Sequence, residues 1–278
     1  MTASVRTKLP FPALVFAAAL LLVAGGCAIA PSPGDREAAA EFAAANDPAE
    51  PTNRAVFAVN RGLDSAILKP VATVYRDWVP KFFQDRMNDV LNNLRAPVIF
   101  VNDLLQGELD RAIATLARFV VNSSFGLLGL NDLATDIGME GHDEDFGQTL
   151  AVWGVPEGPY VMLPIFGPSN PRDTVGLVVD FLIDPFNVWA GNTDREFAVL
   201  SRAGARGVDQ RAIHMEALDE IERTSLDYYA AIRSLYRQRR AEEIRNGKSS
   251  GALPPAPGLS QLPADGGTAA IDPVARTQ

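Results

Sequence analysis

The chain contains few of the residues from which metal centres and catalytic triads are built. It has one cysteine and two histidines among 278 residues, whereas a zinc site or a triad needs several such groups in a defined arrangement. The only cluster of potential ligands is His142-Asp143-Glu144-Asp145. Consecutive residues point in different directions, and the spacing matches neither a zinc site nor a calcium loop. We therefore expect a solvated acidic loop here, with a metal site as the alternative.

Signatures of catalysis and of phosphate loops are also absent. Ser123 or Ser124 could serve as a nucleophile beside His142 or His214, as in a lipase, but no G-x-S-x-G elbow surrounds either serine. The central glycines are not followed by the Lys-Ser/Thr ending of a phosphate loop. We expect neither enzyme activity nor a cofactor.

The chain has no excess of positive charge. Its 25 Lys and Arg face 34 Asp and Glu, which gives a net charge of −9. Nucleic-acid binding relies on Lys and Arg side chains that neutralise phosphates. The one basic cluster, Arg237 to Arg245, lies at the end of an expected helix, where cations suit the helix dipole. We expect no nucleic-acid partner.

The N-terminal residues have the order of a secretory signal. Arg6 and Lys8 precede an apolar run over residues 11–23, small residues at 24–26 and the lone Cys27. A cysteine in this place resembles a bacterial lipobox, in which the thiol is acylated. The alternative is a soluble secreted protein with a spare cysteine, which an oxidising compartment makes a liability. We expect residues 1–26 to be a signal peptide and Cys27 to be lipidated.

The rest of the chain divides into three parts by composition. Residues 27–46 are expected to form a flexible tether, residues 47–246 one helical domain, and residues 247–278 a disordered Gly-, Pro- and Ala-rich tail. Acyl chains on a cysteine anchor a protein firmly without a membrane span. Ala28 stands where lipoproteins retained at the inner membrane typically carry Asp, so the lipobox resemblance implies the inner leaflet of the outer membrane.

Apolar residues at helical spacing predict a mostly α fold. Only Tyr160–Phe166 is expected to be extended. In the first half of the domain, the first expected helix begins at an Asn or Thr cap near residue 53 and ends at Ile67, and a second begins at Lys69-Pro70. Three more are expected from about residue 81 to Pro97, from Pro97 to Gly107 and over 108–122. In the second half, expected helices run from Asn170-Pro171 to a turn at Asp184-Pro185, from a capping box at 193–196 through Leu218, and over about 225–245.

The stretch Phe119–Pro168 is apolar at both ends but interrupted by Gly and Pro. Neither end reaches the run of about 20 apolar residues that a membrane-spanning helix needs. Broken apolar backbone is tolerated at membrane depth only where protein buries it or where it lines a cavity. The stretch is therefore either lipid-facing and cavity-lining, or an ordinary core with turns.

A series of short motifs runs in order through the helical domain. They are Asp47-Pro48, Asn53-Arg54, Lys69-Pro70-Val71, Tyr75-Arg76-Asp77, Asn92-Asn93-Leu94, Val101-Asn102-Asp103-Leu104-Leu105-Gln106-Gly107, Arg118-Phe119, Gly126-Leu127-Leu128-Gly129-Leu130, the run from His142 to Leu150, Gly158-Pro159-Tyr160 and Arg172-Asp173. This series resembles the MlaA (VacJ) family of phospholipid-binding lipoproteins, from Asp47 to about Val188.

The resemblance implies a flattened helical ring that lies in the inner leaflet of the outer membrane and has a central amphipathic channel. It implies a protein that is not an enzyme. Such a protein removes phospholipids misplaced in the outer leaflet and passes them, with a porin trimer and the soluble carrier MlaC as partners, towards the inner membrane. The alternatives are a structural envelope lipoprotein acting as a scaffold and a lipid hydrolase.

Mixed polar and apolar side chains in the central stretch are candidates for the channel or the membrane face, and the resemblance adds two residues from the first helix. These candidates are Phe57, Asn60, Phe119, Asn122, Phe125, Gly126, Leu127, Leu128, Leu130, Phe146 and Gln148. Gly141 and Gly147 bracket the acidic run and are candidate hinges for a movable hairpin. The alternative for the polar groups is that Asn and Ser satisfy helix ends and turns.

Overall fold

A computed structural model describes residue 42 and residues 45–246 of the chain. The chain divides into two units, Met1–Ile244 and Arg245–Gln278, and every helix and strand below belongs to the first. The expected signal peptide, Cys27, most of the expected tether and the expected tail lie outside the described residues.

The described part of the first unit is mostly helical, as the sequence predicts. Its elements are α3 (Glu50–Leu63), the π-helical turn η2 (Asp64–Leu68), α4 (Lys69–Trp78), α5 (Lys81–Gln106), α6 (Leu109–Ser124), α7 (Leu133–Asp136), α8 (Phe146–Val152), β1 (Val161–Leu163), β2 (Gly167–Ser169), α9 (Pro171–Ile183), α10 (Pro185–Asn192), α11 (Glu196–Ile213), α12 (Met215–Thr224) and α13 (Tyr228–Ile244).

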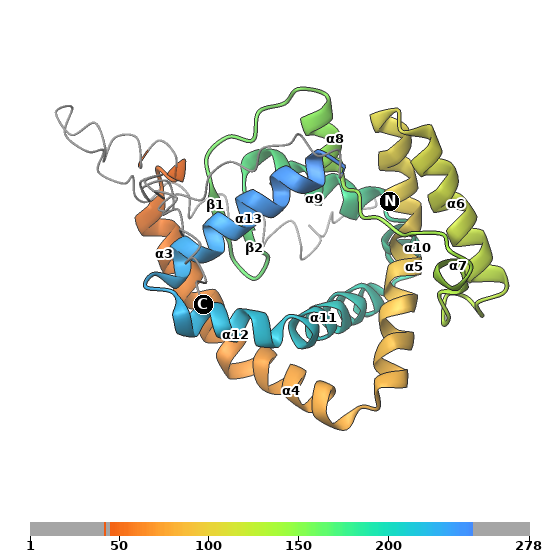
Figure 1. Cartoon of the computed structure of the whole chain (residues 1–278), viewed down its shortest axis with the longest axis horizontal. Helices are drawn as coiled ribbons and strands as arrows, with labels where there is room; N and C mark the ends of the chain where they lie inside the picture. Colours follow the sequence, from red (N-terminus) through yellow and green to blue (C-terminus); the bar gives the residue numbers. More distant parts are fainter. Residues whose placement is uncertain (1–41, 43–44, 247–278) are drawn as a thin grey trace, which may run out of the picture. The chain divides into compact units, whose positions relative to one another are not determined.

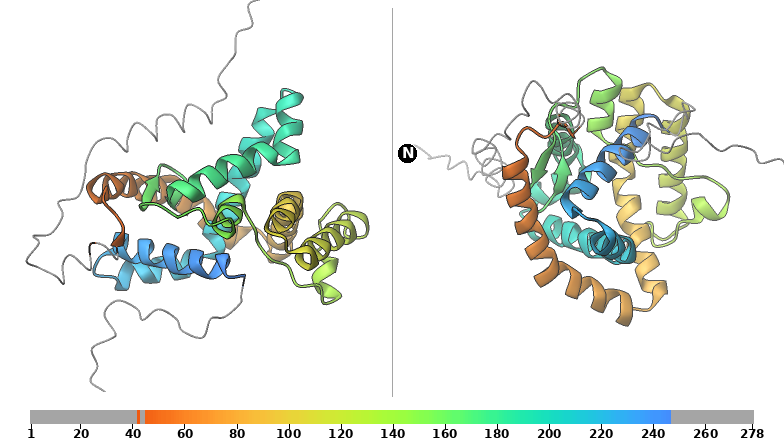
Figure 2. Two further views of the ribbon diagram at one scale, coloured as in Figure 1. Left: turned by 90° about the horizontal axis from the view of Figure 1, so that it is seen from above. Right: turned by 60° about the vertical axis from the view of Figure 1, so that its left-hand side comes forward.

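The elements of this unit form a ring (Figure 1). α3 continues through η2 into α4, and α5 follows; α5 contacts α8, α8 contacts α13, α13 contacts β2, and β1 contacts α3 again. α11 packs against both α4 and α5. Seen edge-on in the left view of Figure 2, α10 projects from the ring on the side away from α13.

The first arc of the ring differs from the expected two helices. α3 begins after Ala49 without a side-chain cap, so the expected Asn or Thr cap is wrong. Asn53 is buried, and its side chain donates to Asp47 (2.7 Å) and to the carbonyl of Tyr160 (3.1 Å). At Lys69-Pro70 the chain does not break; η2 widens the helix instead, because Pro70 lacks an N–H and its ring crowds the preceding turn.

The expected helix boundary at Pro97 is wrong. α5 is one helix of 26 residues with Pro97 inside it. Its second half is buried around Val98, Ile99 and Asn102, and this packing outweighs the lost backbone hydrogen bond. The expected stop at Gly107 is confirmed: Gly107 takes the left-handed conformation (φ 77°), as glycine at a helix C-terminus commonly does.

The second half of the chain departs from the expected elements in several places, among them the short helices α7, α8 and α10, which were not expected. Asn170 caps α9, as predicted, by accepting from the N–H of Asp173. The expected capping box at 193–196 is wrong, since Thr193 donates to the carbonyl of Trp189 and closes α10. The expected long helix ends at Ile213, before α12. β1 is extended as predicted, and its partner β2 was missed because Gly167-Pro168-Ser169 has low β-propensity.

The buried core is divided between two small clusters: Ala72, Ala212 and Met215 join α4, α11 and α12, and a second cluster lies where the hairpin meets α3 and α13. Tyr160, Met162 and Tyr229 are buried together, and Phe57 packs edge-on against Tyr229 with ring centroids 5.5 Å apart. Many large apolar side chains lie outside such clusters. Among the described residues no single helix is long and apolar enough to cross a membrane; only α9 and α10 together, bent by 57°, meet that criterion by length and composition.

Candidate functional site

The acidic run is only partly solvated: Asp143 is exposed, but Glu144 is buried and Asp145 is half-buried, so the expected solvated loop is wrong for these two residues. The side chain of Glu144 has no exposed surface. It accepts hydrogen bonds from Arg111 (2.6 Å) and Gln106 (2.8 Å). Burial raises the pKa of Glu144, and these two donors oppose the rise. The expectation failed because the partners of Glu144 come from α5 and α6, more than 30 residues upstream.

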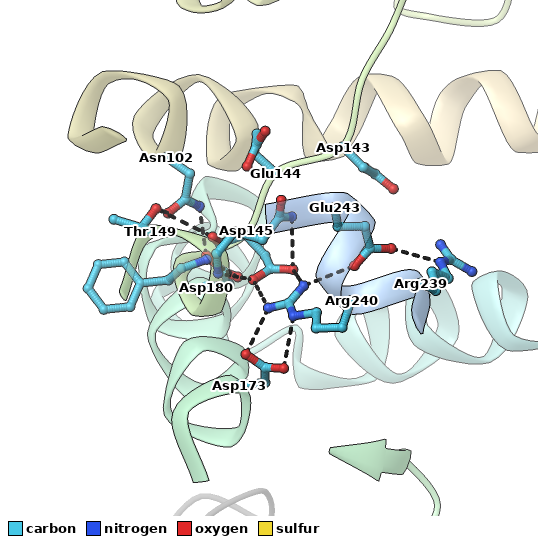
Figure 3. Close-up of polar contacts among 12 residues, drawn as sticks. Asn102, Asp143, Glu144, Asp145, Thr149, Asp173, Asp180, Arg239, Arg240 and Glu243 are labelled. Carbon is cyan, nitrogen blue, oxygen red and sulfur yellow. Dashed lines mark hydrogen bonds and ion pairs between the residues drawn. The ribbon is translucent and has the colours of Figure 1, made fainter. Parts of the chain in front are cut away.

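Asp145 connects three helices through Arg240 (Figure 3). It caps α8 by accepting from the N–H of Gln148, and it takes two hydrogen bonds from Arg240 of α13 at 2.6 and 2.7 Å. Arg240 also donates twice to Asp173 of α9, at 2.8 and 3.0 Å. Burial alone would raise the pKa of Asp145, but the bonds and charge of Arg240 outweigh it and hold that pKa at about 2.

His142 and the two serines do not form a catalytic arrangement. His142 Nε2 contacts both carboxylate oxygens of Asp103, at 2.9 and 3.0 Å, and Thr115 donates to the same carboxylate. Ser123 Oγ accepts from Asn93. No hydrogen bond in the described part of the chain joins a serine to a histidine, and no group of three His, Cys, Asp or Glu there is placed to hold a metal.

A pocket of about 700 Å³ lies beside this polar cluster. Its lining combines charged groups with aliphatic and aromatic ones. The lining residues are Arg95, Asp145, Pro168, Ser169, Asp173, Leu177, Asp180, Leu218, Ile232, Leu235, Tyr236, Arg239, Arg240 and Glu243. They come from α5, the N-cap of α8, β2, α9, α12 and α13, so elements far apart in the sequence contribute. The pocket is amphipathic, and its volume lies in the range of small-molecule sites.

The helices of the ring expose apolar stripes. One stripe runs along α3, η2 and α4 at intervals of three or four residues: Val59, Leu63, Ile67, Val71, Val74 and Trp78. A second lies on α6: Leu109, Ile113, Leu116 and Val120. Their helical spacing was predicted, and the structure shows that both stripes are exposed. Contiguous apolar surface of this kind marks a protein or membrane contact.

The turn after α6 is apolar and exposed. Leu127 and Leu128 are 64% and 79% exposed, and both take left-handed φ angles, 56° and 61°. Gly126 is required for packing, since a Cβ would lie 2.3 Å from the Asn131 carbonyl oxygen. The buried Asn122 side chain accepts from the N–H of Ala134 and donates to Asp132. The hydrogen bonds of Asn122 therefore stabilise the turn.

The other candidate channel residues lie in several places. Phe57 belongs to the core, and Asn60 holds the hairpin by donating to the Leu163 carbonyl and accepting from the Ile165 N–H. Phe119, with Asn122, lines a separate cavity of about 420 Å³. The remaining candidates divide between the exposed turn and α8: Phe125 and Leu130 are exposed, Phe146 stacks edge-on with Trp153, and Gln148 is buried. In the part that the structure describes, none of the candidates lines the 700 Å³ pocket.

The two candidate hinges have different surroundings. Gly141 is exposed, and a Cβ there would lie 3.2 Å from the Arg118 guanidinium. Gly147 lies inside α8, where a Cβ would come within 2.5 Å of Arg240 Nη2. Gly176 of α9 would place a Cβ 2.3 Å from the Gly147 nitrogen. Close approach of α8, α9 and Arg240 therefore explains the glycine at 147.

Sequence reasoning missed the pocket residues of α9, α12 and α13. The sequence predicts that Arg240 belongs to a basic cluster at the end of a helix, where cations interact favourably with the helix dipole. In the structure Arg240 is buried and donates hydrogen bonds to the carboxylates of Asp145 and Asp173. The available signal was the i, i+3/i+4 spacing of Ile232, Tyr236 and Arg240, which places them on one face of α13.

A helical ring with exposed apolar stripes and an amphipathic pocket has the features of a membrane-associated protein. Comparison with known proteins gives the family. Residues 45–243 match the family model of the MlaA lipoprotein, and the chain belongs to this family, as its motifs predicted.

Individual relatives support the same family assignment. The chain is 33% identical over 208 residues to the intermembrane phospholipid transport system lipoprotein MlaA of Haemophilus influenzae, covering 73% of this chain and 81% of that one. It is 31% identical over 211 residues to the protein of that name from Escherichia coli K12, covering 73% and 79%. An uncharacterised Rickettsia typhi protein is 36% identical over 197 residues, covering 70% and 77%.

A solved structure has the same ring-like fold. It was described under the heading of a structural basis for maintenance of bacterial outer membrane lipid asymmetry, and it matches with a TM-score of 0.64 and 32% identity. The match covers 71% of this chain and 98% of the solved chain.

Proposed function

We propose that this protein is an outer-membrane lipoprotein that takes up phospholipids misplaced in the outer leaflet and passes them towards the inner membrane. The observation that carries the proposal is the amphipathic pocket of about 700 Å³ between α9, α12, α13 and β2. The names of the Haemophilus and Escherichia relatives, which are intermembrane phospholipid transport lipoproteins, support it.

The pocket suits a molecule that is charged at one end and apolar at the other. A phospholipid headgroup needs polar partners, which Arg95 and Arg239 can supply, and its acyl chains need apolar ones, such as Leu177 and Leu218. A pocket lined by one kind of group would exclude one end of the lipid.

The exposed stripes on α3, η2, α4 and α6 support a body that lies in the membrane interface. Each large aliphatic side chain moved from water into lipid is worth about 1.5–3 kcal/mol. The bent pair α9 and α10 exposes Leu182, Val188 and Trp189 as well. These helices are suited to lie within one leaflet, as in monotopic proteins.

The remaining parts of the proposal concern attachment and partners. Acylation of Cys27 would anchor the chain to the periplasmic face of the outer membrane. A porin trimer would hold the ring in the bilayer, and the soluble carrier MlaC would receive the lipid. The candidate membrane-face residues Phe125, Leu127, Leu128 and Leu130, all exposed in one turn, are suited to contact acyl chains.

The test is to purify the full-length lipoprotein in detergent, exchange the detergent extensively, and quantify retained phospholipid by mass spectrometry. We expect retained phospholipid and no release of free fatty acid. A protein that keeps no phospholipid above an unrelated lipoprotein would favour the scaffold alternative. Release of fatty acid from added phospholipid would favour the hydrolase.

A further inference from the structure

Arg206 of α11 has no ion-paired carboxylate within the part of the chain that the structure describes, unlike its neighbour Arg202 on the same helix. Its side chain is half-buried and donates one hydrogen bond, to Asn92 Oδ1 of α5, at 2.6 Å. None of the ion pairs among residues 45–246 includes Arg206. By contrast, Arg211, on the same helix, pairs with Asp64 (2.9 Å) and Asp219 (3.1 Å).

A second guanidinium, that of Arg95, lies close enough to Arg206 for its charge to lower the pKa of Arg206. Arg95 stands one helical turn after Asn92 on α5, the helix against which α11 packs. Arg95 lines both the 700 Å³ pocket and the 420 Å³ cavity, and Asn92 also lines the latter. The only ion pair of Arg95 in the described part of the chain is with Asp143 (2.9 Å), whose side chain is half exposed.

The positive charge of Arg206 is only partly neutralised by the groups around it. Burial lowers the pKa of Arg206, and the like charges of Arg95 and Arg202 lower it further, while Asp143 and Asp209 oppose this. Those carboxylates are already engaged, because Asp209 accepts from Tyr75 and Asn88 and Asp143 accepts from Arg95. Arg202 is paired with Asp184 at 2.6 Å. Two half-buried cations that repel each other form a site that an anion would stabilise.

We propose that Arg95 and Arg206 together bind the phosphodiester of a phospholipid headgroup beside the amphipathic pocket, with Asn92 positioning Arg206. The proposal rests on the proposed function and names its headgroup site. Guanidinium groups match the oxygen pairs of a phosphate in a fork geometry, and two of them from facing helices can hold one phosphate from two sides. The exposed Asp143 is the partner that the phosphate would displace from Arg95.

The experiment uses the full-length lipoprotein in detergent and measures affinity by calorimetry for three probes. These are dihexanoyl phosphatidylglycerol, dihexanoylglycerol without a phosphate, and inorganic phosphate. The variants are Arg206→Gln, Arg95→Gln and Arg206→Lys. The lysine variant keeps the positive charge but loses the paired N–H donors of the guanidinium. Arg223→Gln on α12 is the matched control, because Arg223 is exposed and, within residues 45–246, pairs only with Glu220 on its own helix.

We expect Arg206→Gln and Arg95→Gln each to weaken binding of the phosphatidylglycerol by about tenfold or more, the loss typical of a charged hydrogen bond. Arg206→Lys should have an intermediate effect, and Arg223→Gln none. Affinity for the phosphate-free lipid should not change. The ligand-free melting temperature of Arg206→Gln should not fall, because the substitution removes a repulsion rather than an ion pair.

Unchanged phosphatidylglycerol affinity in Arg206→Gln would overturn the proposal, as would an equal loss for the phosphate-free lipid, which would indicate a structural role. Inorganic phosphate binding as tightly as the lipid, and lost in the same variants, would mean a free-phosphate site and would also overturn it. If the wild-type protein binds neither lipid, the proposed function itself fails, and this outcome is distinct from the others.

Discussion

Arg240 and Asp145 lie 95 residues apart in the sequence and form a two-point ion pair, with Nη1 to Oδ2 at 2.6 Å and Nη2 to Oδ1 at 2.7 Å. The pair joins the last helix to the N-terminus of α8, at the edge of the amphipathic pocket. Because the same guanidinium binds Asp173, it also fixes α9. The charged wall of the pocket is therefore part of the framework that closes the ring.

Removing Arg240 should destabilise the fold strongly. Arg240→Gln leaves the carboxylate of Asp145 without its charged donor and leaves Asp173 with Arg172 as its charged donor, and breaking such a buried pair costs about 3–5 kcal/mol. Arg239→Gln is the control, since Arg239 is 71% exposed and pairs with Glu243 on its own helix, an interaction worth under about 1 kcal/mol. Urea unfolding in detergent measures both; equal losses in the two variants would contradict this role for Arg240.

The pair also predicts an acid dependence. The folded-state pKa of Asp145 is about 2, below its ordinary value of 3.8, so its contribution is present above the unfolded pKa and is lost as the pH falls through about 2. The shift corresponds to roughly 2 kcal/mol. The difference in unfolding free energy between wild type and Asp145→Asn should therefore shrink from pH 5 towards pH 2. A difference that stays constant over that window would show that Asp145 keeps an ordinary pKa.

Contact between α8 and α9 predicts a steric effect at Gly176. A Cβ there would lie 2.3 Å from the Gly147 nitrogen and 2.7 Å from its Cα, so Gly176→Ala must push the helices apart, at a cost of about 1–3 kcal/mol or more. Gly204→Ala in α11 is the matched change, because nothing lies within 4 Å of its Cβ position. It should be neutral or stabilising by up to about 1 kcal/mol. Chemical denaturation separates the two, and equal stability would refute the close approach.

The exposed turn predicts an effect on membrane binding without an effect on folding. Asn tolerates the left-handed backbone found at Leu127 and Leu128, so a double Leu→Asn variant should fold normally. It should bind phospholipid vesicles at least about tenfold more weakly, because two large apolar side chains no longer leave water. Binding is measured by flotation of protein with phospholipid vesicles. All variants carry Cys27→Ala, so that no acyl chain contributes to binding, and Arg223→Asn is the control. Flotation equal to that control would place the turn outside the membrane.

Helical periodicity predicted which residues share a face, but not what that face contacts. Leu109, Ile113 and Leu116 do share a face of α6, and it is exposed. Hydrophobic spacing looks the same for a core and for a lipid surface, because both exclude water. The sequence alone therefore left the environment of the stripes open.

The acidic run shows a second limit of local sequence. Glu144 and Asp145 are charged, so composition places them in solvent, but Arg111 and Arg240 neutralise them from distant parts of the chain. Pro97 shows the same limit for secondary structure, since the packing of α5 overrides a local helix breaker. By contrast, Gly107 and Asn170 act through their own turns, and both predictions were confirmed.

The most direct test of the account asks whether phospholipid occupies the pocket. A photo-crosslinking amino acid replaces Leu177, which lines the pocket, or Leu116, which lies on the exposed stripe of α6. Each protein is made in cells with radiolabelled phospholipid, purified through exchange of detergent, and then irradiated. The account predicts labelled phospholipid joined to position 177 and at most weak labelling at 116. Labelling at 177 no stronger than at 116, in protein that remains folded, would contradict it.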